Sequence, residues 1–122
     1  MSGLQPEDIG YINAHGTGTR NNDVSEGQAI VNVFREHIPY VSSTKAMTGH
    51  TTSASGGVEA VISILALRQK LIPANLRWSC PMPELPFTPV SRVMEEVSFR
   101  HVLSNSFGFG GNNSALIFSA VE

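Results

Sequence analysis

The chain has 122 residues, of which 41% are hydrophobic and 15% charged, and its formal net charge is −2. This length and composition allow one small domain with its own core and exclude an intrinsically disordered segment. The eight basic residues are scattered without forming a stripe, which argues against nucleic-acid binding.

Nothing in the sequence predicts export or membrane insertion. The longest apolar stretch, residues 58–67, is interrupted by Glu59 and Ser63 and is too short to span a bilayer. The first residues lack the basic and apolar regions of a signal peptide. The single cysteine, Cys80, cannot form an internal disulfide and fits a reducing compartment. We therefore expect a cytoplasmic protein without a membrane span.

The first part of the chain predicts two short strands around a helix. Residues 9–14 form an apolar run followed by glycines, as a buried strand entering a loop does. Asp23 is predicted to open the helix, because Glu26 follows three positions later in a variant of the capping box. Pro39 is predicted to stop it, and residues 40–43 are predicted to form the second strand. The apolar stripe of this helix is made of Ile30, Val33 and Phe34.

A longer helix is predicted after a polar loop at residues 44–52. It begins with the small residues 53–57, which indicates that another backbone approaches closely, and its last turn contains Lys70. Residues 72–76 are predicted to form a third strand. The stretch 78–89 contains four prolines and is predicted to be an irregular connection. The apolar residues of the helix are Val58, Val61, Ile62, Leu65 and Leu67.

Two closing strands are predicted at residues 97–106 and 115–121, joined by the glycine-rich residues 108–113. No internal repeat or second domain is visible, so residues 1–122 are expected to form one domain. Alternating strands and helices, followed by two consecutive strands, predict an α/β fold. Its sheet should be largely parallel with an antiparallel end.

Three loops have an unusual density of polar and small residues. They are residues 13–19, 42–50 and 105–111, and each follows a predicted strand. Because sites of open α/β sheets form outside the carboxyl ends of the strands, we expect the three loops to converge on one site.

These segments, in this order and spacing, resemble the β-ketoacyl-acyl-carrier-protein synthases, condensing enzymes of the thiolase superfamily. The likeness runs nearly end to end and includes Asp23, eight residues after His15, and Glu59 in the long helix. It implies a partial thiolase-like C-terminal domain, with a mixed, mostly parallel sheet flanked by helices. It also implies that the family's first strand and helix are missing. Since that strand is expected inside the sheet, two strands here would lack their neighbour.

The resemblance implies a decarboxylative Claisen condensation. An acyl group is held on a cysteine, malonyl-carrier protein loses carbon dioxide, and the resulting carbanion attacks the acyl thioester. By resemblance, His15 and His50 each donate an N–H to the thioester oxygen on which negative charge develops. Both should be neutral imidazoles, and the helix N-terminus that follows His50 disfavours its protonation.

The resemblance also assigns supporting roles. Lys45 matches the family's active-site lysine and should orient His50 within a network that includes Asp23, Glu26 or Glu59. A helix cap explains Asp23 and Glu26 equally well, so both readings remain open.

Two further loops match the family's substrate-handling residues. Thr17 and Thr19 match hydroxyls that bind the pantetheine arm of the carrier. Phe109 matches a gating phenylalanine whose backbone N–H completes the oxyanion hole of the acyl-cysteine. The flanking glycines, which allow the loop to move, are Gly108, Gly110 and Gly111.

Other site classes are disfavoured. A dinucleotide motif is rejected because Asn113 stands in place of its third glycine and a strand follows. The two histidine motifs lack a third zinc ligand at a suitable spacing, so no metal is expected. Cys80, His37 and His101 are interpreted as structural or exposed residues.

The family's nucleophilic cysteine has no counterpart in this sequence, so the chain alone is expected to be inactive. Its expected partners are an acyl carrier protein, which brings the phosphopantetheine, and a cysteine-bearing half or second synthase subunit in a homo- or hetero-oligomer. No cofactor of its own is expected. Gly18 and Asn112 depart from the residues usual in fatty-acid members.

Two functional interpretations remain. The first is one piece of a condensing enzyme of fatty-acid, polyene or polyketide synthesis. The second is a non-catalytic partner that binds or dimerises, as chain-length factors do. Retention of His15, Lys45 and His50 favours the first, because a structural subunit does not need two aimed imidazoles.

Overall fold

A computed structural model describes residues 3–14, 20–43, 55–74, 90, 92–107 and 113–121. The elements in chain order are the 3₁₀ helix η1 (Pro6–Asp8), β1 (Tyr11–Asn13), α1 (Arg20–Phe34), β2 (Tyr40–Ser42), α3 (Ser55–Gln69), β3 (His101–Phe107) and β4 (Asn113–Ser119).

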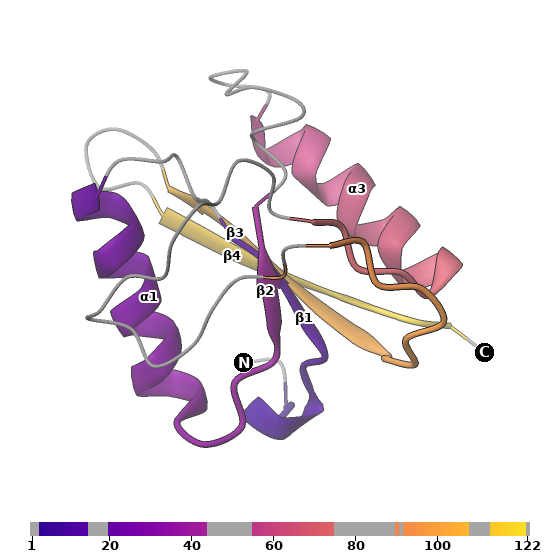
Figure 1. Cartoon of the computed structure of the whole chain (residues 1–122), viewed down its shortest axis with the longest axis horizontal. Coiled ribbons are helices and arrows are strands. Elements are labelled where there is room, and N and C mark those ends of the chain that lie inside the picture. Colours follow the sequence, from indigo (N-terminus) through magenta and orange to yellow (C-terminus); the bar gives the residue numbers. More distant parts are fainter. Residues whose placement is uncertain are drawn as a thin grey trace.

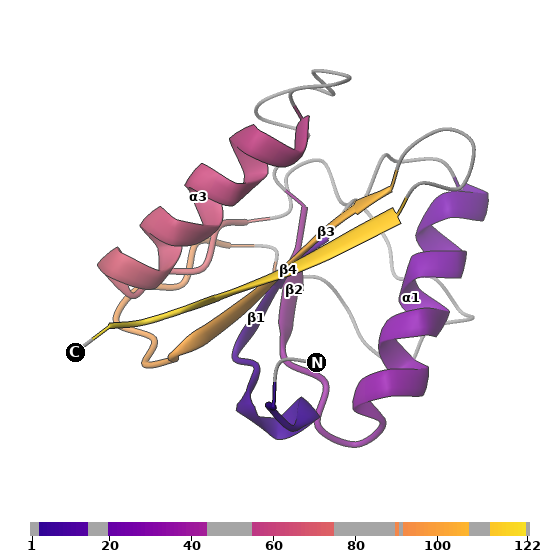
Figure 2. The same ribbon diagram turned by 180° about the vertical axis from the view of Figure 1, so that it is seen from behind.

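The four strands form one sheet in the order β2-β1-β3-β4. Strand β1 pairs in parallel with β2 on one side and with β3 on the other, whereas β3 and β4 are antiparallel. Helix α1 covers one face of the sheet and α3 the opposite face (Figures 1 and 2). The predicted α/β class, with a mostly parallel sheet and an antiparallel end, is confirmed.

The sheet has no gap in its interior. Ile12 of β1 lies directly opposite Leu103 of β3, and the backbone groups of these two strands satisfy each other. The expectation that a missing strand leaves two strands without their neighbour is therefore wrong.

The structure differs from the predicted elements at residues 35–39 and 72–76, and residues 97–100 precede β3, which begins at His101. Helix α1 ends at Phe34, before Pro39, because Arg35 adopts a left-handed conformation with φ 53°. Ile72 forms one antiparallel bridge with Met94 instead of a third strand, with N···O distances of 2.8 and 3.0 Å in the two directions. Pro73 has no N–H to extend that pairing. Residues 75 and 76 lie outside the described part.

The start of α1 also differs from the prediction. The helix begins at Arg20, so Asp23 lies within its first turn and does not cap it. Glu26 is then the seventh residue of the helix, beyond the first four N–H groups that a capping side chain can serve. The capping-box reading of Asp23 and Glu26 is therefore wrong.

The core consists of two clusters, one on each face of the sheet. The α1-side cluster contains Ile9, Ile12, Ala14, Ile30, Phe34 and Val41. The α3-side cluster contains Tyr11, Ala66, Ile72 and Val102. In the predicted stripe of α1, Ile30 and Phe34 are buried, but Val33 is 58% exposed. Alternate residues of β1 thus face opposite helices, as the period of two in a strand requires.

Gly10 marks a close approach at the entrance to β1. Its N–H donates to the carbonyl of His101 at 3.1 Å, and a Cβ atom added there would overlap the Cβ of Phe99. Gly57, in the first turn of α3, has open space around the same position.

We expect Gly10→Ala to lower the free energy of unfolding by about 1–3 kcal/mol, because overpacking must displace Phe99. Gly57→Ala is the matched control and should raise it by about 1 kcal/mol, since alanine is the better helix former. Urea denaturation measures both changes. Equal effects of the two substitutions would contradict the close approach at Gly10.

Candidate functional site

The carboxyl ends of three strands define the candidate site. Because β1, β2 and β3 are parallel, their last residues, Asn13, Ser42 and Phe107, lie at the same edge of the sheet. Helices α1 and α3 begin at this edge as well (Figure 1). All three loops predicted to carry the chemistry follow described strand ends at this edge.

Most of the predicted site residues lie outside the described part of the chain and remain predictions. They are His15, Thr17, Thr19, Lys45, His50, Gly108, Phe109, Gly110 and Gly111. Asp23 lies in the first turn of α1, and its side chain is not described. Of the predicted supporting carboxylates, the structure describes the side chains of Glu26 and Glu59.

Beneath α3, a buried amide connects the end of β1 to the helix. The Nδ2 of Asn13 donates to the backbone carbonyl of Glu59 at 3.3 Å and to the Oγ of Ser63 at 3.2 Å. The Ser63 hydroxyl in turn donates to the carbonyl of Glu59 at 2.8 Å. All three residues are buried. Glu59 thus faces the sheet, at the end of α3 that is nearest to the candidate site.

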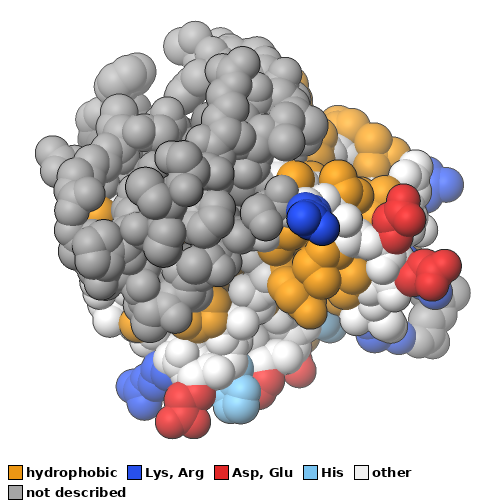
Figure 3. Space-filling model, in the orientation of Figure 1, with side chains coloured by type: hydrophobic (Ala, Val, Ile, Leu, Met, Phe, Trp, Pro, Cys, Tyr) orange, Lys and Arg blue, Asp and Glu red, His pale blue; other side chains and the backbone are white. Residues whose placement is uncertain are grey.

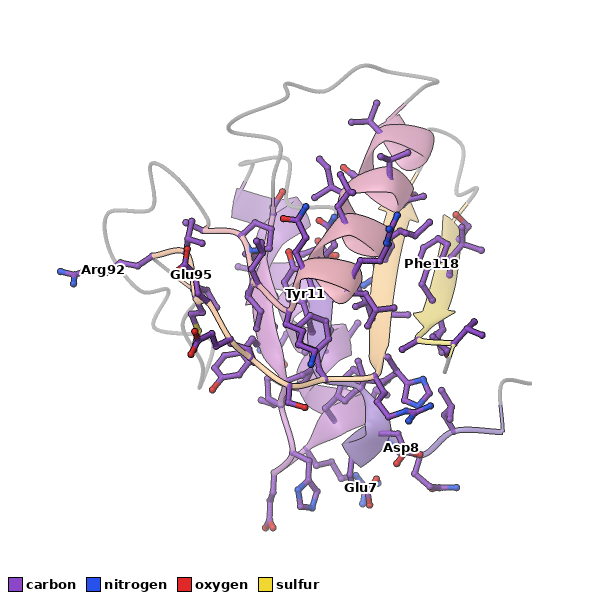
Figure 4. All side chains as sticks on the ribbon, turned by 90° about the vertical axis from the view of Figure 1, so that its right-hand side faces the viewer. Glu7, Asp8, Tyr11, Arg92, Glu95 and Phe118 are labelled. Atoms are coloured by element: carbon purple, nitrogen blue, oxygen red, sulfur yellow. The ribbon has the colours of Figure 1, made fainter. Side chains whose placement is uncertain are left out.

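Tyr11 forms a second buried polar contact on the same face of the sheet. Its hydroxyl lies 2.7 Å from the Oγ of Ser42, so the phenol joins β1 to β2 through side chains. Tyr11 itself belongs to the core on the α3 side of the sheet (Figure 4). Burial raises the pKa of Tyr11 above its ordinary range, and the negative charge of Glu59 raises it further. The hydrogen bond with Ser42 acts in the opposite direction. The phenol therefore keeps its proton at any physiological pH.

On the α1 side, a carboxylate is paired with an amide. The Nδ2 of Asn105, in β3, donates to Oε1 of Glu26 at 3.3 Å, and both residues are buried. Glu26 and Glu59 therefore lie on opposite faces of the sheet. Hydrogen bonding to the charged form compensates part of the desolvation cost of a buried carboxylate.

Sequence reasoning missed the roles of Asn13, Asn105 and Ser63. The sequence analysis places both asparagines where a predicted strand meets a polar loop, and the structure shows that Asn13 closes β1 and that Asn105 lies within β3. A signal was present, because asparagine is depleted in strands and a buried one requires partners. The identity of those partners, 50 and 79 positions away in sequence, could not be read from the pattern.

Other site classes have no support in the described residues. Within the described ranges, no group of three or more histidine, cysteine or acidic side chains is placed to hold a metal ion. None of the described helices is long and apolar enough to cross a membrane.

The arrangement is that of an α/β domain whose candidate site lies at the carboxyl edge of its sheet. Residues 1–79 match the family model of the C-terminal domain of β-ketoacyl synthases. The chain therefore belongs to the β-ketoacyl synthase family.

Similar proteins of known sequence agree with this assignment. The chain is 39% identical, over 99% of its length, to 3-oxoacyl-(acyl-carrier-protein) synthase 2 of Staphylococcus aureus (strain COL). It is 44% identical, over the same share, to the protein of that name from Synechocystis sp.. In both comparisons the chain spans only 30% of the relative's length.

Solved structures give the same result. The ishigamide ketosynthase/chain length factor superposes with a TM-score of 0.93 at 36% identity, over 98% of this chain and 30% of that one. The ketosynthase ApeO, in complex with its chain length factor ApeC from Xenorhabdus doucetiae, gives 0.88 at 40% identity over the same shares. The predicted family and fold are confirmed.

The raised pKa of Tyr11 predicts a specific pH dependence. Above pH about 10 the unfolded chain releases the phenolic proton, whereas the folded chain retains it. The stability contributed by Tyr11 is therefore complete below that pH and is lost as the pH rises further, by about 1.4 kcal/mol per pH unit.

Tyr11→Phe should be about 1 kcal/mol less stable than wild type at pH 8, because the bond to Ser42 is lost. That deficit should vanish by pH 11, because at this pH the wild type loses stability through the raised pKa of Tyr11, whereas the variant has no phenol at that position to titrate. Urea unfolding at both pH values measures it. Tyr40→Phe, at an exposed position, is the control and should show no such change. A deficit independent of pH would contradict the assignment.

Proposed function

We propose that this chain supplies the histidine part of a β-ketoacyl synthase active site, for decarboxylative condensation of an acyl thioester with malonyl-carrier protein. The observation that carries the proposal is the shared carboxyl edge of β1, β2 and β3, from which the loops with His15, Lys45, His50 and Phe109 depart. Membership of the β-ketoacyl synthase family supports condensation as the proposed reaction. The partial domain at residues 1–122 is one portion of the catalytic unit.

In the proposed reaction, the malonyl group loses carbon dioxide and leaves an enolate on its thioester. His15 and His50 donate N–H groups to the enolate oxygen and stabilise the charge that develops there. The α-carbon then attacks the acyl thioester of the cysteine. A carbon–carbon bond forms, and the carbon–sulfur bond breaks to release the cysteine thiolate. The N–H of Phe109 stabilises the second oxyanion.

Other residues are proposed to position the two histidines, the pantetheine arm and the Phe109 loop. Lys45 orients His50, and Glu26 is the described carboxylate that supports the network from the α1 side, held in place by Asn105. Thr17 and Thr19 bind the pantetheine arm. The glycines around Phe109, Gly108, Gly110 and Gly111, allow its loop to move.

The nucleophilic cysteine must come from another part of the enzyme. The exposed face of α3 supports this, because Val61, Ile64 and Leu65 are 57%, 40% and 44% exposed while Glu59 and Ser63 of the same helix are buried. Figure 3 shows exposed hydrophobic side chains on the right of the molecule, where Figure 1 has α3 and the segment that follows residue 92. We infer that the cysteine-bearing portion covers this apolar face.

The proposal also covers the cofactor requirement, the location and the oligomeric state of the enzyme. The carrier protein brings the substrate, so the chain needs no cofactor of its own. A reducing, cytoplasmic location keeps the cysteine nucleophile of the assembled enzyme in its thiol form. The assembled enzyme is proposed to be a homo- or hetero-oligomer.

A second candidate is a non-catalytic subunit of the chain-length-factor type. It is worth testing because ketosynthase–chain length factor assemblies occur among the similar structures. Loss of malonyl decarboxylation on removal of either histidine separates the two, because a non-catalytic subunit does not use these imidazoles.

The catalytic test uses a chimera in which this chain replaces the matched region of the Synechocystis relative. We expect the chimera to decarboxylate malonyl-carrier protein and to condense it with an acyl thioester, and the chain alone to do neither. His15→Ala and His50→Ala should each reduce decarboxylation by about 100- to 1000-fold.

His37→Ala, in the exposed segment after α1, is the matched control and should leave the rate unchanged. Circular dichroism and size-exclusion chromatography establish that each chimera is folded. A folded chimera whose decarboxylation does not depend on His15 or His50 would overturn the proposal, as would turnover by the chain alone.

The apolar face of α3 has its own test, in the chimera expressed as two separate portions. Leu65→Lys should weaken their association at least about tenfold, because it places a charge in the apolar contact. Lys70→Glu, just after α3, is the control and should have little effect. Isothermal titration calorimetry measures both. Unchanged binding by the Leu65 variant would show that α3 is not covered by the cysteine-bearing portion.

A further inference from the structure

Asn13 joins two elements that border the proposed histidine loops, namely β1, which precedes His15, and α3, which follows His50. It is the last residue of β1, two positions before His15, and its side chain bonds to α3, which begins five positions after His50. Resting on the proposed function, we propose that Asn13 is a positioning residue. Its amide fixes the position of β1, the strand that leads to His15, relative to α3, the helix that follows His50 in the sequence.

The contact is a closed triangle of hydrogen bonds. One Nδ2 atom uses its two hydrogens on the carbonyl of Glu59 and the hydroxyl of Ser63, at 3.3 and 3.2 Å, and Ser63 returns to the same carbonyl at 2.8 Å. Asn13 and Ser63 are fully buried, and Glu59 is 2% exposed. Water therefore does not compete for these donors and acceptors.

One end of this contact lies in the interior of the sheet. In the register of the parallel strands, Asn13 of β1 lies opposite Ser42 of β2 and Ser104 of β3. The N–H of Ala14 also donates to the carbonyl of Ser42, at 2.8 Å. A shift of the Asn13 backbone would therefore disturb the pairing of β1 with both of its neighbours.

The other end is a helix whose described core contacts are apolar. In the α3-side core cluster, α3 contributes Ala66, near its last turns, with Leu67 packed alongside. Apolar packing is non-directional and tolerates sliding along the helix axis. The hydrogen bonds from Asn13 reach the first half of α3 and determine how far along its axis the helix lies relative to β1.

The substitution Asn13→Leu removes both hydrogen bonds of the amide without opening a large cavity. It retains most of the side-chain volume, and it leaves the Glu59 carbonyl bonded within the helix and to Ser63. Ser63→Ala is a milder second variant that removes one of the two acceptors and stays informative where Asn13→Leu fails to fold. Val102→Ala, which creates a cavity on the same face of the sheet, is the matched control.

The readout is the imidazole NMR spectrum of the full chain across a pH titration. Asn13→Leu should move the His15 and His50 resonances and change their apparent pKa values by about half a unit or more, with Ser63→Ala giving a smaller change in the same direction. His37 and His101 should stay as in wild type. Val102→Ala should leave all four histidines unchanged.

Two results would overturn the inference. In the first, the His15 and His50 signals are identical in wild type and in both variants. In the second, Asn13→Leu and Val102→Ala move all four histidines alike, which indicates a merely structural role. In the chimera, Asn13→Leu should lower kcat for decarboxylation about tenfold with KM unchanged. A wild-type chimera without activity would refute the proposed function, but the titration would still decide the role of Asn13.

Discussion

The parallel pairing of β1 with strands on both of its sides is the constraint on which the rest of the structure depends. Its three residues are completely buried, and each lies between a partner in β2 and a partner in β3. Because a strand alternates its side chains between the two faces, Ile12 faces the α1 layer while Tyr11 and Asn13 face the α3 layer. A single strand thus organises both cores and the edge at which the loops emerge.

Three buried side-chain contacts of the described residues lie beneath the candidate site. Tyr11 with Ser42, Asn13 with α3, and Asn105 with Glu26 all lie on or beside the three parallel strands. Polar groups in a low-dielectric interior are costly without partners, but when they are paired they specify geometry more sharply than apolar contacts do. Hydrogen bonds therefore determine the geometry beneath the candidate site, whereas the two core clusters are held mainly by apolar contacts.

Helix α3 carries apolar residues on its exposed side as well as on its buried side, where Ala66 belongs to the core. Glu59 and Ser63 face the sheet, and Val61, Ile64 and Leu65 are exposed. A helix that is apolar on its outer side normally lies inside a larger protein. This agrees with a chain that spans about 30% of the length of the synthases it resembles. The same helix thus has two tasks in the proposed enzyme, since one face positions the site and the other contacts the remaining polypeptide.

The sequence by itself determined the fold class, the family and the approximate positions of both helices and four strands. Short apolar runs, glycine breaks and helical spacing are local signals, and the histidine, lysine and glycine–phenylalanine motifs identified the family without any contact being known. Only the tertiary structure decided that β1 lies directly beside β3, that Ile72 pairs with Met94 outside the sheet, and that Glu26 and Glu59 lie on opposite faces. It also decided which side of α3 is buried, because both sides of that helix carry apolar residues. The physical reason is that hydrogen bonds between distant strands and the direction of a buried side chain depend on what packs opposite, and one-dimensional spacing does not contain that information.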